Sequence, residues 1–437
     1  MFHTQVEFNL FRIDRRRIDL VPSFRQPHGG RLGLLACLII LLTPYFAPRA
    51  AAQESSEASI AAYADAANFQ TNGAIALAIE AWQTFLREYP KDPMASKAAH
   101  FLGVCYMQQE SPDYVAAARS FAQALQDPDY DLREESLINQ GWCLYASAGE
   151  APNRDQDRLR ASIQSFKTLR KEYPQSTFLD RALFYSGEAA YGLGDAKQAI
   201  ANYDQLLALP QAKESPLRCD ALYARGIAYE ELDQFDNAVA SFRQLLSSCP
   251  NSDLVTDVHL RIGDTAILNQ DYEQAIESFD AAFESTDKTE DRSYAIFRQA
   301  FALVQANQPG EAAKKYEQLL EDYPDSRYTA AATLASAQST YRSGDLDEAA
   351  QRFQRVLKQN NSAASTEAAH WLARIYLRKG DPAKAIEVAR RQLDRGAEGK
   401  FVVTLKLDLA EALSMNPETL EASLEAFETT YRDAPQD

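Results

Sequence analysis

The sequence predicts an all-α fold, a solenoid of about ten antiparallel helix pairs stacked in a line. The chain has 437 residues, more than the roughly 250–300 residues that one hydrophobic core usually organises. A small residue recurs about every 37 residues, and a second small residue followed by an aromatic residue keeps the same register. Helix pairs of this length bury their apolar faces only against neighbouring pairs, so they must stack.

Residues 1–52 differ in composition from the rest of the chain. They hold seven Arg and three acidic residues, a net charge of +4, and an apolar run from Leu32 to Ala47 leads to the small residues before Gln53. A basic flank, a short apolar core and a small-residue site are the parts of a secretory signal. A helix over the apolar run would span about 24 Å, short of the ~30 Å hydrocarbon core of a bilayer. We therefore expect a signal cleaved after Ala52 and a periplasmic protein. The alternative is an inner-membrane anchor formed by Leu32–Ala47.

Residues 53–437 carry the repeat. The small residue in the middle of each first helix is expected at Ala66, Gly103, Gly141, Gly187, Gly226, Gly263, Ala300, Ala337, Ala373 and Ala410. The second helix carries its own small residue and, four positions later, usually an aromatic one. These pairs are Ala78 and Trp82, Ala117 and Phe121, Ser162 and Phe166, Ala199 and Tyr203, Ala238 and Phe242, Ala275 and Phe279, Ala312 and Tyr316, Ala349 and Phe353, Ala385 and Ala389, and Ala422 and Ala426. Small residues let the two helices approach closely, and the aromatic ring fills the seam with the next pair.

Glycine and aspartate mark the turn inside several pairs. Left-handed caps at the end of the first helix are expected at Gly73, Gly194, Gly344 and Gly380. N-caps of the second helix are expected at Asp195, Asp271, Asp345 and Asp381. Residues 147–158 are the one large insertion; because they are polar and contain Gly and Pro, we expect an exposed loop.

Prolines end the second helix in alternate units, at Pro90, Pro174, Pro250 and Pro324. Serines two residues after three of them are expected to cap the next helix; they are Ser176, Ser252 and Ser326.

This pattern of small residue, Gly or Asp, Ala, aromatic residue and Pro resembles the tetratricopeptide repeat, whose period is 34 residues. The tracts Glu88-Tyr89-Pro90, Glu172-Tyr173-Pro174-Gln175-Ser176 and Asp322-Tyr323-Pro324-Asp325-Ser326 resemble its bacterial envelope subgroup. That subgroup holds the BamD-type outer-membrane assembly lipoproteins and the CpoB/YbgF-type periplasmic proteins. The resemblance covers roughly residues 58–428 and implies a right-handed superhelical solenoid. The chain departs from the BamD type by its larger number of units and poor lipid site, and from the CpoB type by lacking a coiled-coil segment before the repeats.

Residue patterns typical of catalysis or of metal binding are absent from the sequence. The five His are scattered, without the spacing of a metal site, and no phosphate-binding glycine loop or nucleophile elbow occurs. We therefore expect no enzyme, no cofactor and no metal.

The cysteines after residue 52 fall into two groups. Cys219 opens a first helix and Cys249 closes the second helix of the same pair, so both stand at one end of an antiparallel hairpin. A disulfide is geometrically allowed there, and two separate thiols are the alternative. Cys105 and Cys143 lie on neighbouring first helices. Because stacked helices lie about 8–10 Å apart, we expect them to be separate core thiols.

First helices should line the concave face of such a solenoid. Side chains one turn before and after each small residue are therefore candidates for a groove that binds peptides, since aromatic anchors with polar rims suit them. The candidates are Tyr63, His100, Trp142, Tyr145, Phe184, Tyr191, Tyr223, Phe297, Phe301, Tyr341, His370 and Arg374. The alternative is that several belong to the core between units, above all Trp142, Phe301, Tyr223 and Tyr341.

The charge of the repeat region limits its partners. The whole chain carries −17 and residues 1–52 carry +4, so the remaining 385 residues carry −21. Such a surface repels nucleic acid and anionic lipid and attracts basic segments of proteins. The sequence thus predicts a non-enzymatic interaction scaffold of the bacterial cell envelope, in outer-membrane assembly, cell division or export. The alternatives are an accessory subunit of an enzyme acting on peptidoglycan or glycan, and a membrane-tethered spacer. The oligomeric state stays open.

Overall fold

The computed structural model describes residues 55–359 and 362–433, and the expected signal or anchor lies outside them. The described residues form twenty α-helices and one short 3-10 helix, with no strand among them. The helices are α1 (Glu57–Thr71), α2 (Ile75–Glu88), α3 (Ala95–Gln108), α4 (Tyr114–Ala124), α5 (Arg133–Ala146), α6 (Gln156–Glu172), α7 (Leu179–Gly192), α8 (Ala196–Leu207), α9 (Arg218–Glu231), α10 (Phe235–Ser248), α11 (Val255–Leu268), α12 (Tyr272–Glu284), α13 (Thr289–Gln305), α14 (Pro309–Asp322), α15 (Thr329–Ser343), α16 (Leu346–Val356), α17 (Ser362–Arg378), α18 (Pro382–Asp394), α19 (Val402–Ser414), η3 (Pro417–Thr419) and α20 (Leu420–Asp433).

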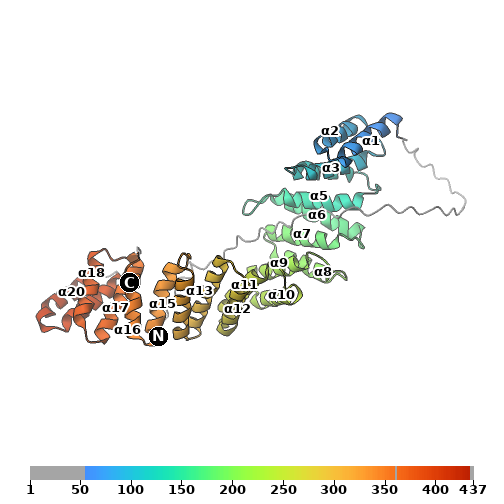
Figure 1. Ribbon diagram of the computed structural model, residues 1–437. Helices are drawn as coiled ribbons and strands as arrows, with labels where there is room; N and C mark the ends of the chain where they lie inside the picture. The colour runs from blue at the N-terminus through green and yellow to red at the C-terminus, as the bar shows by residue number, and fades with distance from the viewer. Residues whose placement is uncertain (1–54, 360–361, 434–437) are drawn as a thin grey trace. The chain divides into compact units, whose positions relative to one another are not determined.

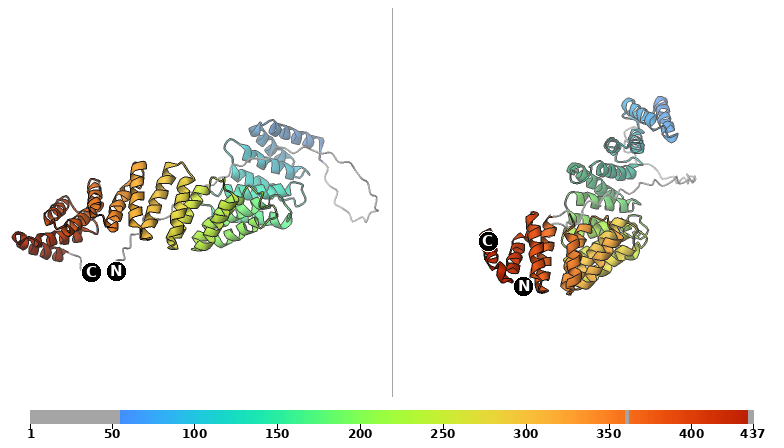
Figure 2. Two further views of the ribbon diagram at one scale, coloured as in Figure 1. Left: turned by 60° about the horizontal axis from the view of Figure 1, so that its bottom comes forward. Right: turned by 60° about the vertical axis from the view of Figure 1, so that its left-hand side comes forward.

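The helices pack in chain order as ten hairpins (Figure 1). Each odd-numbered helix packs on the even-numbered helix that follows it, and each even-numbered helix also packs on the first helix of the next hairpin. The further views in Figure 2 show the same succession of neighbours. The predicted all-α solenoid of about ten helix pairs is confirmed. Among the described residues, no helix is both long and apolar enough to cross a membrane.

Close contact at the small residues holds each hairpin together. All ten first-helix positions, from Ala66 to Ala410, are buried. At Gly226 an added Cβ would lie 2.3 Å from Cε1 of Phe242, and at Gly141 it would lie 2.4 Å from Cε1 of Phe166. The aromatic ring of the second helix therefore rests directly on the backbone of the first. This contact explains why the sequence keeps a small residue and an aromatic residue in register.

The register predicted for the last hairpin was wrong by one residue. Ser423, not Ala422, is buried at 1% exposure, and its Oγ donates to the carbonyl of Ala410 at 2.8 Å. The same contact joins Ser162 and Gly141 in the third hairpin, at 2.7 Å. The short helix η3 between α19 and α20 shifts the spacing. The aromatic position of the last unit is therefore Phe427 and not Ala426.

The expected turns inside the hairpins are confirmed. The four predicted cap glycines have positive φ angles of 73–97°. The four predicted aspartates each accept a backbone N–H of the second helix, as Asp195 does from Gln198 at 2.9 Å. Three hairpins that lack a cap glycine place Asp233, Gln270 and Asn307 at positive φ. In these three units, a non-glycine residue adopts a conformation that glycine adopts at less cost.

The insertion and the serine turns between hairpins differ from the sequence prediction. Helix α6 begins at Gln156 with Asp155 as its N-cap, so the insertion is a connection of residues 147–155 and residues 156–158 form the first turn of α6. Ser176 Oγ accepts the N–H of Phe178 at 3.0 Å, but Phe178 itself is the N-cap position of α7. Ser252 and Ser326 make the same bond. These serines hold the turn before the helix and do not cap it.

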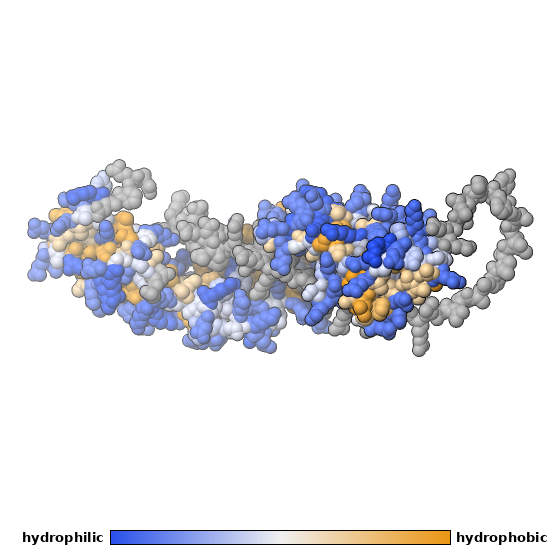
Figure 3. All heavy atoms as spheres, turned by 90° about the horizontal axis from the view of Figure 1, so that it is seen from above, coloured by the Kyte–Doolittle hydropathy of each residue, from blue (hydrophilic) through white to orange (hydrophobic). Residues whose placement is uncertain are grey.

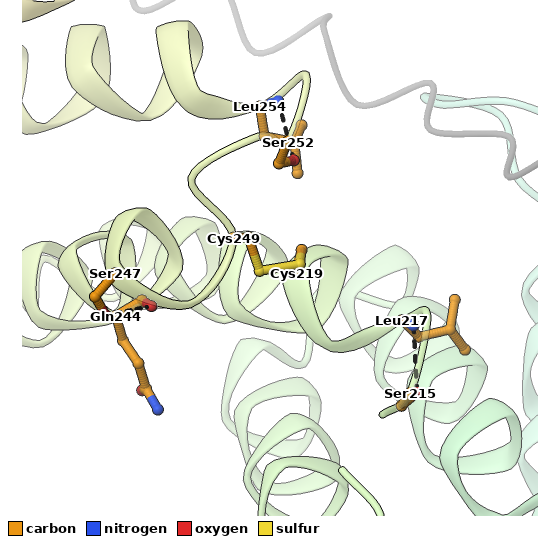
Figure 4. Close-up of a disulfide and its surroundings, with 8 residues drawn as sticks. All are labelled: Ser215, Leu217, Cys219, Gln244, Ser247, Cys249, Ser252 and Leu254. Carbon is orange, nitrogen blue, oxygen red and sulfur yellow. Dashed lines mark hydrogen bonds between the residues drawn. A yellow bond between two sulfur atoms is a disulfide. The ribbon is translucent and has the colours of Figure 1, made fainter. Parts of the chain in front are cut away.

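A disulfide joins Cys219 at the start of α9 to Cys249 at the end of α10 (Figure 4). The two Cα atoms are 6.2 Å apart, because the antiparallel hairpin brings these helix ends together. On either side of the bond, Ser215 and Ser252 accept backbone N–H groups of the turns that lead into α9 and α11. Cys105 and Cys143 are free and buried, as predicted.

Reduction of this disulfide is expected to lower the free energy of unfolding by about 2–4 kcal/mol, since the bond closes a loop across one hairpin. Thermal melting with and without reductant measures the loss. The control is the double variant Cys219→Ser/Cys249→Ser, whose melting should not respond to reductant. Peptide mapping without reduction should find the two cysteine peptides linked; free thiols at both positions would contradict the bond.

Candidate protein-interaction surface

Four of the predicted groove residues are buried in the structure. His100 and Phe297 are 6% exposed, and Phe184 and Tyr223 are 3% exposed. Each lies one turn before the small residue of its first helix, where the aromatic ring of the same hairpin and the next hairpin cover it. Tyr223, for example, packs on Phe242 and hydrogen-bonds across to α11. As groove-lining residues these four were predicted wrongly, because the packing between units covers them.

The other candidates are half-buried and pack between adjacent helices. They are Tyr63, Trp142, Tyr145, Tyr191, Phe301, Tyr341, His370 and Arg374. Tyr63 meets the ring of Trp82 edge-on at 4.8 Å, and Tyr145 lies 5.5 Å from the ring of Tyr185. Each of these side chains keeps part of its surface exposed, so they remain candidates for contact with a partner.

The structure brings three first helices together through a row of aromatic side chains, the aromatic row. It consists of Tyr341 on α15, His370 and Trp371 on α17, and Phe401 before α19. Ring centroids are 5.0 Å apart between Tyr341 and Trp371, and 5.2 Å between His370 and Phe401. All four are half-buried. Trp371 and Phe401 were missed in the sequence, although the position of Trp371, two residues before the small residue Ala373, is the signal that could have found it.

Charged groups border the aromatic row. Asp408 on α19 accepts from His370 Nδ1 and lies 3.7 Å from Arg374, which in turn pairs with Glu411 at 2.5 Å. Glu367 accepts from the indole Nε1 of Trp371 at 3.3 Å. The row thus combines apolar rings with a polar rim, which is the composition of peptide-binding surfaces.

The buried charges of the central helices are paired, which suits a structural role. Asp264 on α11 accepts from Nε of Arg298 at 2.7 Å and from the hydroxyl of Tyr294 at 2.8 Å, both on α13. Arg261 donates to Glu230 at 3.0 Å and to Asp257 at 2.9 Å. Apart from the bond to Asp257, which lies on α11 with Arg261, these bonds run between successive first helices. Within the described part of the chain, no group of three or more His, Cys, Asp or Glu could hold a metal ion.

His100 is expected to make stability depend on pH. Burial lowers its pKa from 6.5 to about 4, and its Nδ1 lies 2.8 Å from Oγ of Ser136. Because the folded chain takes up this proton at lower pH than the unfolded chain, stability is lost as the pH falls from about 6.5 to about 4, by up to about 3 kcal/mol. Chemical denaturation across this range should show the loss, and the variant His100→Gln should show less of it. An unchanged pH dependence in that variant would contradict the prediction.

Four family models match the chain. A tetratricopeptide repeat-like domain matches residues 283–404, and tetratricopeptide repeats match residues 186–253 and 256–289. The outer membrane lipoprotein family matches residues 52–213. The tetratricopeptide matches and the lipoprotein match together extend over nearly all ten hairpins.

One curated protein is similar over part of its length. The human mitochondrial import receptor subunit TOM70 is 27% identical over 205 residues, which are 45% of this chain and 32% of that protein. The chain thus spans about a third of the length of this curated relative.

Two tetratricopeptide repeat proteins are among the similar solved structures. A tetratricopeptide repeat protein from Parabacteroides merdae has 17% identity over 65% of this chain and 100% of its own, with a TM-score of 0.37. The C-terminal part of a tetratricopeptide protein from Cytophaga hutchinsonii is 13% identical in sequence. The match covers 65% of this chain and 98% of that chain, with a TM-score of 0.44. With its ten stacked hairpins and its matches to the repeat, the chain is a tetratricopeptide repeat protein, and its first units resemble the outer membrane lipoprotein family.

Proposed function

We propose that this chain is a non-enzymatic protein-interaction scaffold of the bacterial cell envelope, exported to the periplasm. The observation that carries the proposal is that the described helices all belong to one run of tetratricopeptide-like hairpins, a fold that acts by binding proteins or peptides. The match of residues 52–213 to the outer membrane lipoprotein family supports the envelope. The disulfide supports export, since disulfides persist in oxidising compartments.

The half-buried side chains of the first helices are the proposed binding surface, with the aromatic row as its best-defined part. Its rings offer apolar anchors, and Glu411 and Glu367 offer acceptors around them. Residues 53–437 carry a net charge of −21, so long-range electrostatic attraction favours a partner with basic segments. TOM70 is named a receptor subunit, which accords with a binding role for the repeat.

Photocrosslinking in cells tests the binding surface. A photoreactive residue in place of Lys400, which is exposed and lies over the ring of Phe401, should crosslink to one or a few proteins. The same residue in place of Arg243, exposed on α10, is the control and should not. Crosslinking at Lys400 should fall in the variant Phe401→Ala if its melting is unchanged. Equal crosslinking at both positions, or turnover of peptidoglycan by the purified chain, would contradict the scaffold.

N-terminal sequencing of the exported protein tests the compartment. Cleavage after Ala52 would leave Gln53 as the first residue. Retention of Leu32–Ala47 would instead favour the inner-membrane anchor and the tethered spacer.

A further inference from the structure

The last hairpin exposes the face that every earlier hairpin covers. Phe427 is 39% exposed, whereas Phe242 and Phe279 at the same position are 0% exposed. Leu424 is 59% exposed, whereas Val239 at the same position is 8% exposed. We call this surface the terminal face; it consists of Leu407 on α19 and Leu420, Leu424, Phe427 and Tyr431 on α20, which are 40–88% exposed apart from Phe427. Figure 3 shows apolar side chains gathered on the end of the molecule that holds α18 and α20.

The apolar residues along α20 have the spacing of a helix that packs against another helix. Its four large apolar residues recur at intervals of four, three and four positions, which places them on one side of the helix. No helix of the described residues lies on this side. Exposed apolar surface of this kind, next to polar residues, is typical of a site that binds another protein.

The internal hairpins indicate what kind of element fits. There the first helix of the next unit packs on the second helix, and in three units its residue two positions before the small residue lies over the aromatic ring. Phe101 stacks on Trp82 with centroids 5.8 Å apart, and Tyr185 stacks on Phe166 at 6.4 Å. Arg298 places its guanidinium 5.9 Å from the ring of Phe279. An occupant of the terminal face should therefore be a helix with a small residue and, two positions earlier, an Arg or an aromatic residue.

The acidic residues of α20 indicate which kind of helix would bind to the terminal face. Glu421, Glu425 and Glu428 are exposed on α20 beside the apolar stripe. A second copy of the chain would bring α1 or α20 to this surface. Helix α1 has exposed Glu57 and Asp65 and no basic residue, so like charges would meet in both arrangements. A basic helix would instead meet opposite charges.

We propose that the terminal face docks a basic amphipathic helix from a partner protein, which continues the solenoid as an eleventh first helix and places an Arg over Phe427. The proposal rests on the function as a scaffold and names one site and one class of partner for it. Binding of this kind is the helix-in-groove mode, in which apolar residues spaced along one side of a helix act as anchors.

A labelled peptide tests the proposal against the full chain. The peptide is residues 289–305 with Glu290→Lys and Asp291→Lys, which makes this first helix basic and keeps Arg298 and Ala300. Fluorescence anisotropy should show saturable binding that weakens as salt rises. The protein variants Leu424→Asp and Phe427→Asp should each weaken binding about tenfold or more. The matched control is Leu268→Asp, since Leu268 on α11 is 43% exposed and outside the terminal face.

Two further controls test the predicted pattern within the peptide. Arg298→Ala removes the cation over Phe427, and Ala300→Leu removes the small residue; both should weaken binding to the wild-type chain. Equal binding to wild type and Leu424→Asp, or no saturable binding, would overturn the proposal. Self-association of the free chain that Leu424→Asp abolishes would overturn it in favour of a second copy. Crosslinking at Lys400 reports on the aromatic row independently, so the scaffold can stand if the terminal face fails.

Discussion

Replacing Phe242 by alanine is expected to lower the free energy of unfolding by about 3–5 kcal/mol. The ring is 0% exposed and rests on the backbone of Gly226, where an added Cβ would lie 2.3 Å from Cε1. Truncation therefore leaves a cavity at the contact between α9, α10 and α11. Because each unit of a solenoid contacts mainly its neighbours, the loss should be local. Hydrogen exchange should rise in α9–α11 and change little in α1–α4.

Other positions of the repeat provide control variants for this prediction. Gly226→Ala should cost about 1–3 kcal/mol through overpacking against the ring. The double variant Gly226→Ala/Phe242→Ala should cost less than the two single losses together, since each change relieves the other. Phe427→Ala should cost much less than Phe242→Ala, because Phe427 is 39% exposed. Equal losses at Phe242 and Phe427 would contradict the assigned packing.

Replacing Asp264 by alanine is expected to lower the free energy of unfolding by about 3–5 kcal/mol, because it removes a carboxylate that the buried guanidinium of Arg298 contacts through two nitrogens. Asp264 and Arg298 are each 6% exposed, and two nitrogens of the guanidinium lie 2.6 and 2.7 Å from Oδ1. Tyr294 would lose the acceptor of its hydroxyl as well. Chemical denaturation of the two proteins measures the difference.

Removing both charges distinguishes the ion pair from simple loss of packing. The double variant Asp264→Leu/Arg298→Met removes both buried charges and should be much closer to wild type than Asp264→Ala. Arg352, a second nearly buried Arg, pairs with Glu348 on the same helix. Glu348→Ala should cost less than Asp264→Ala, since the side chain of Glu348 is 49% exposed. If the double variant at Asp264 and Arg298 were as unstable as Asp264→Ala, packing and not charge would be the cause.

Local chemistry explains the predictions that the structure confirms. A left-handed turn after Gly194 and a capping carboxylate at Asp195 need only neighbouring residues, so both could be predicted from the chain. The contact between Gly226 and Phe242 could be predicted because the same spacing recurs in almost every unit. The last hairpin could not be predicted from this spacing, because η3 moves its small and aromatic positions by one residue, to Ser423 and Phe427.

The exposure of the candidate groove residues could be predicted only in part. His100, Phe184 and Tyr223 stand at one position of the repeat, and spacing alone does not say how far the next unit covers that position. The half-buried Tyr341 and His370 share the face with Trp371 and Phe401 only because three first helices stack. The proposed binding surface comes from helices whose small residues lie about 37 residues apart in the sequence, and its exposure depends on how closely these helices pack.

The sequence by itself determined the all-α class, the number of hairpins and the contact between small and aromatic residues, because these follow from helical periodicity and local turns. It also allowed a bond between Cys219 and Cys249, which the hairpin brings within reach. Only the tertiary structure decided which side chains are covered, as the difference between Phe242 and Phe427 shows. The physical reason is that the neighbouring unit of a solenoid decides whether a residue is buried. The position of that residue in its helix depends only on the sequence of its own unit.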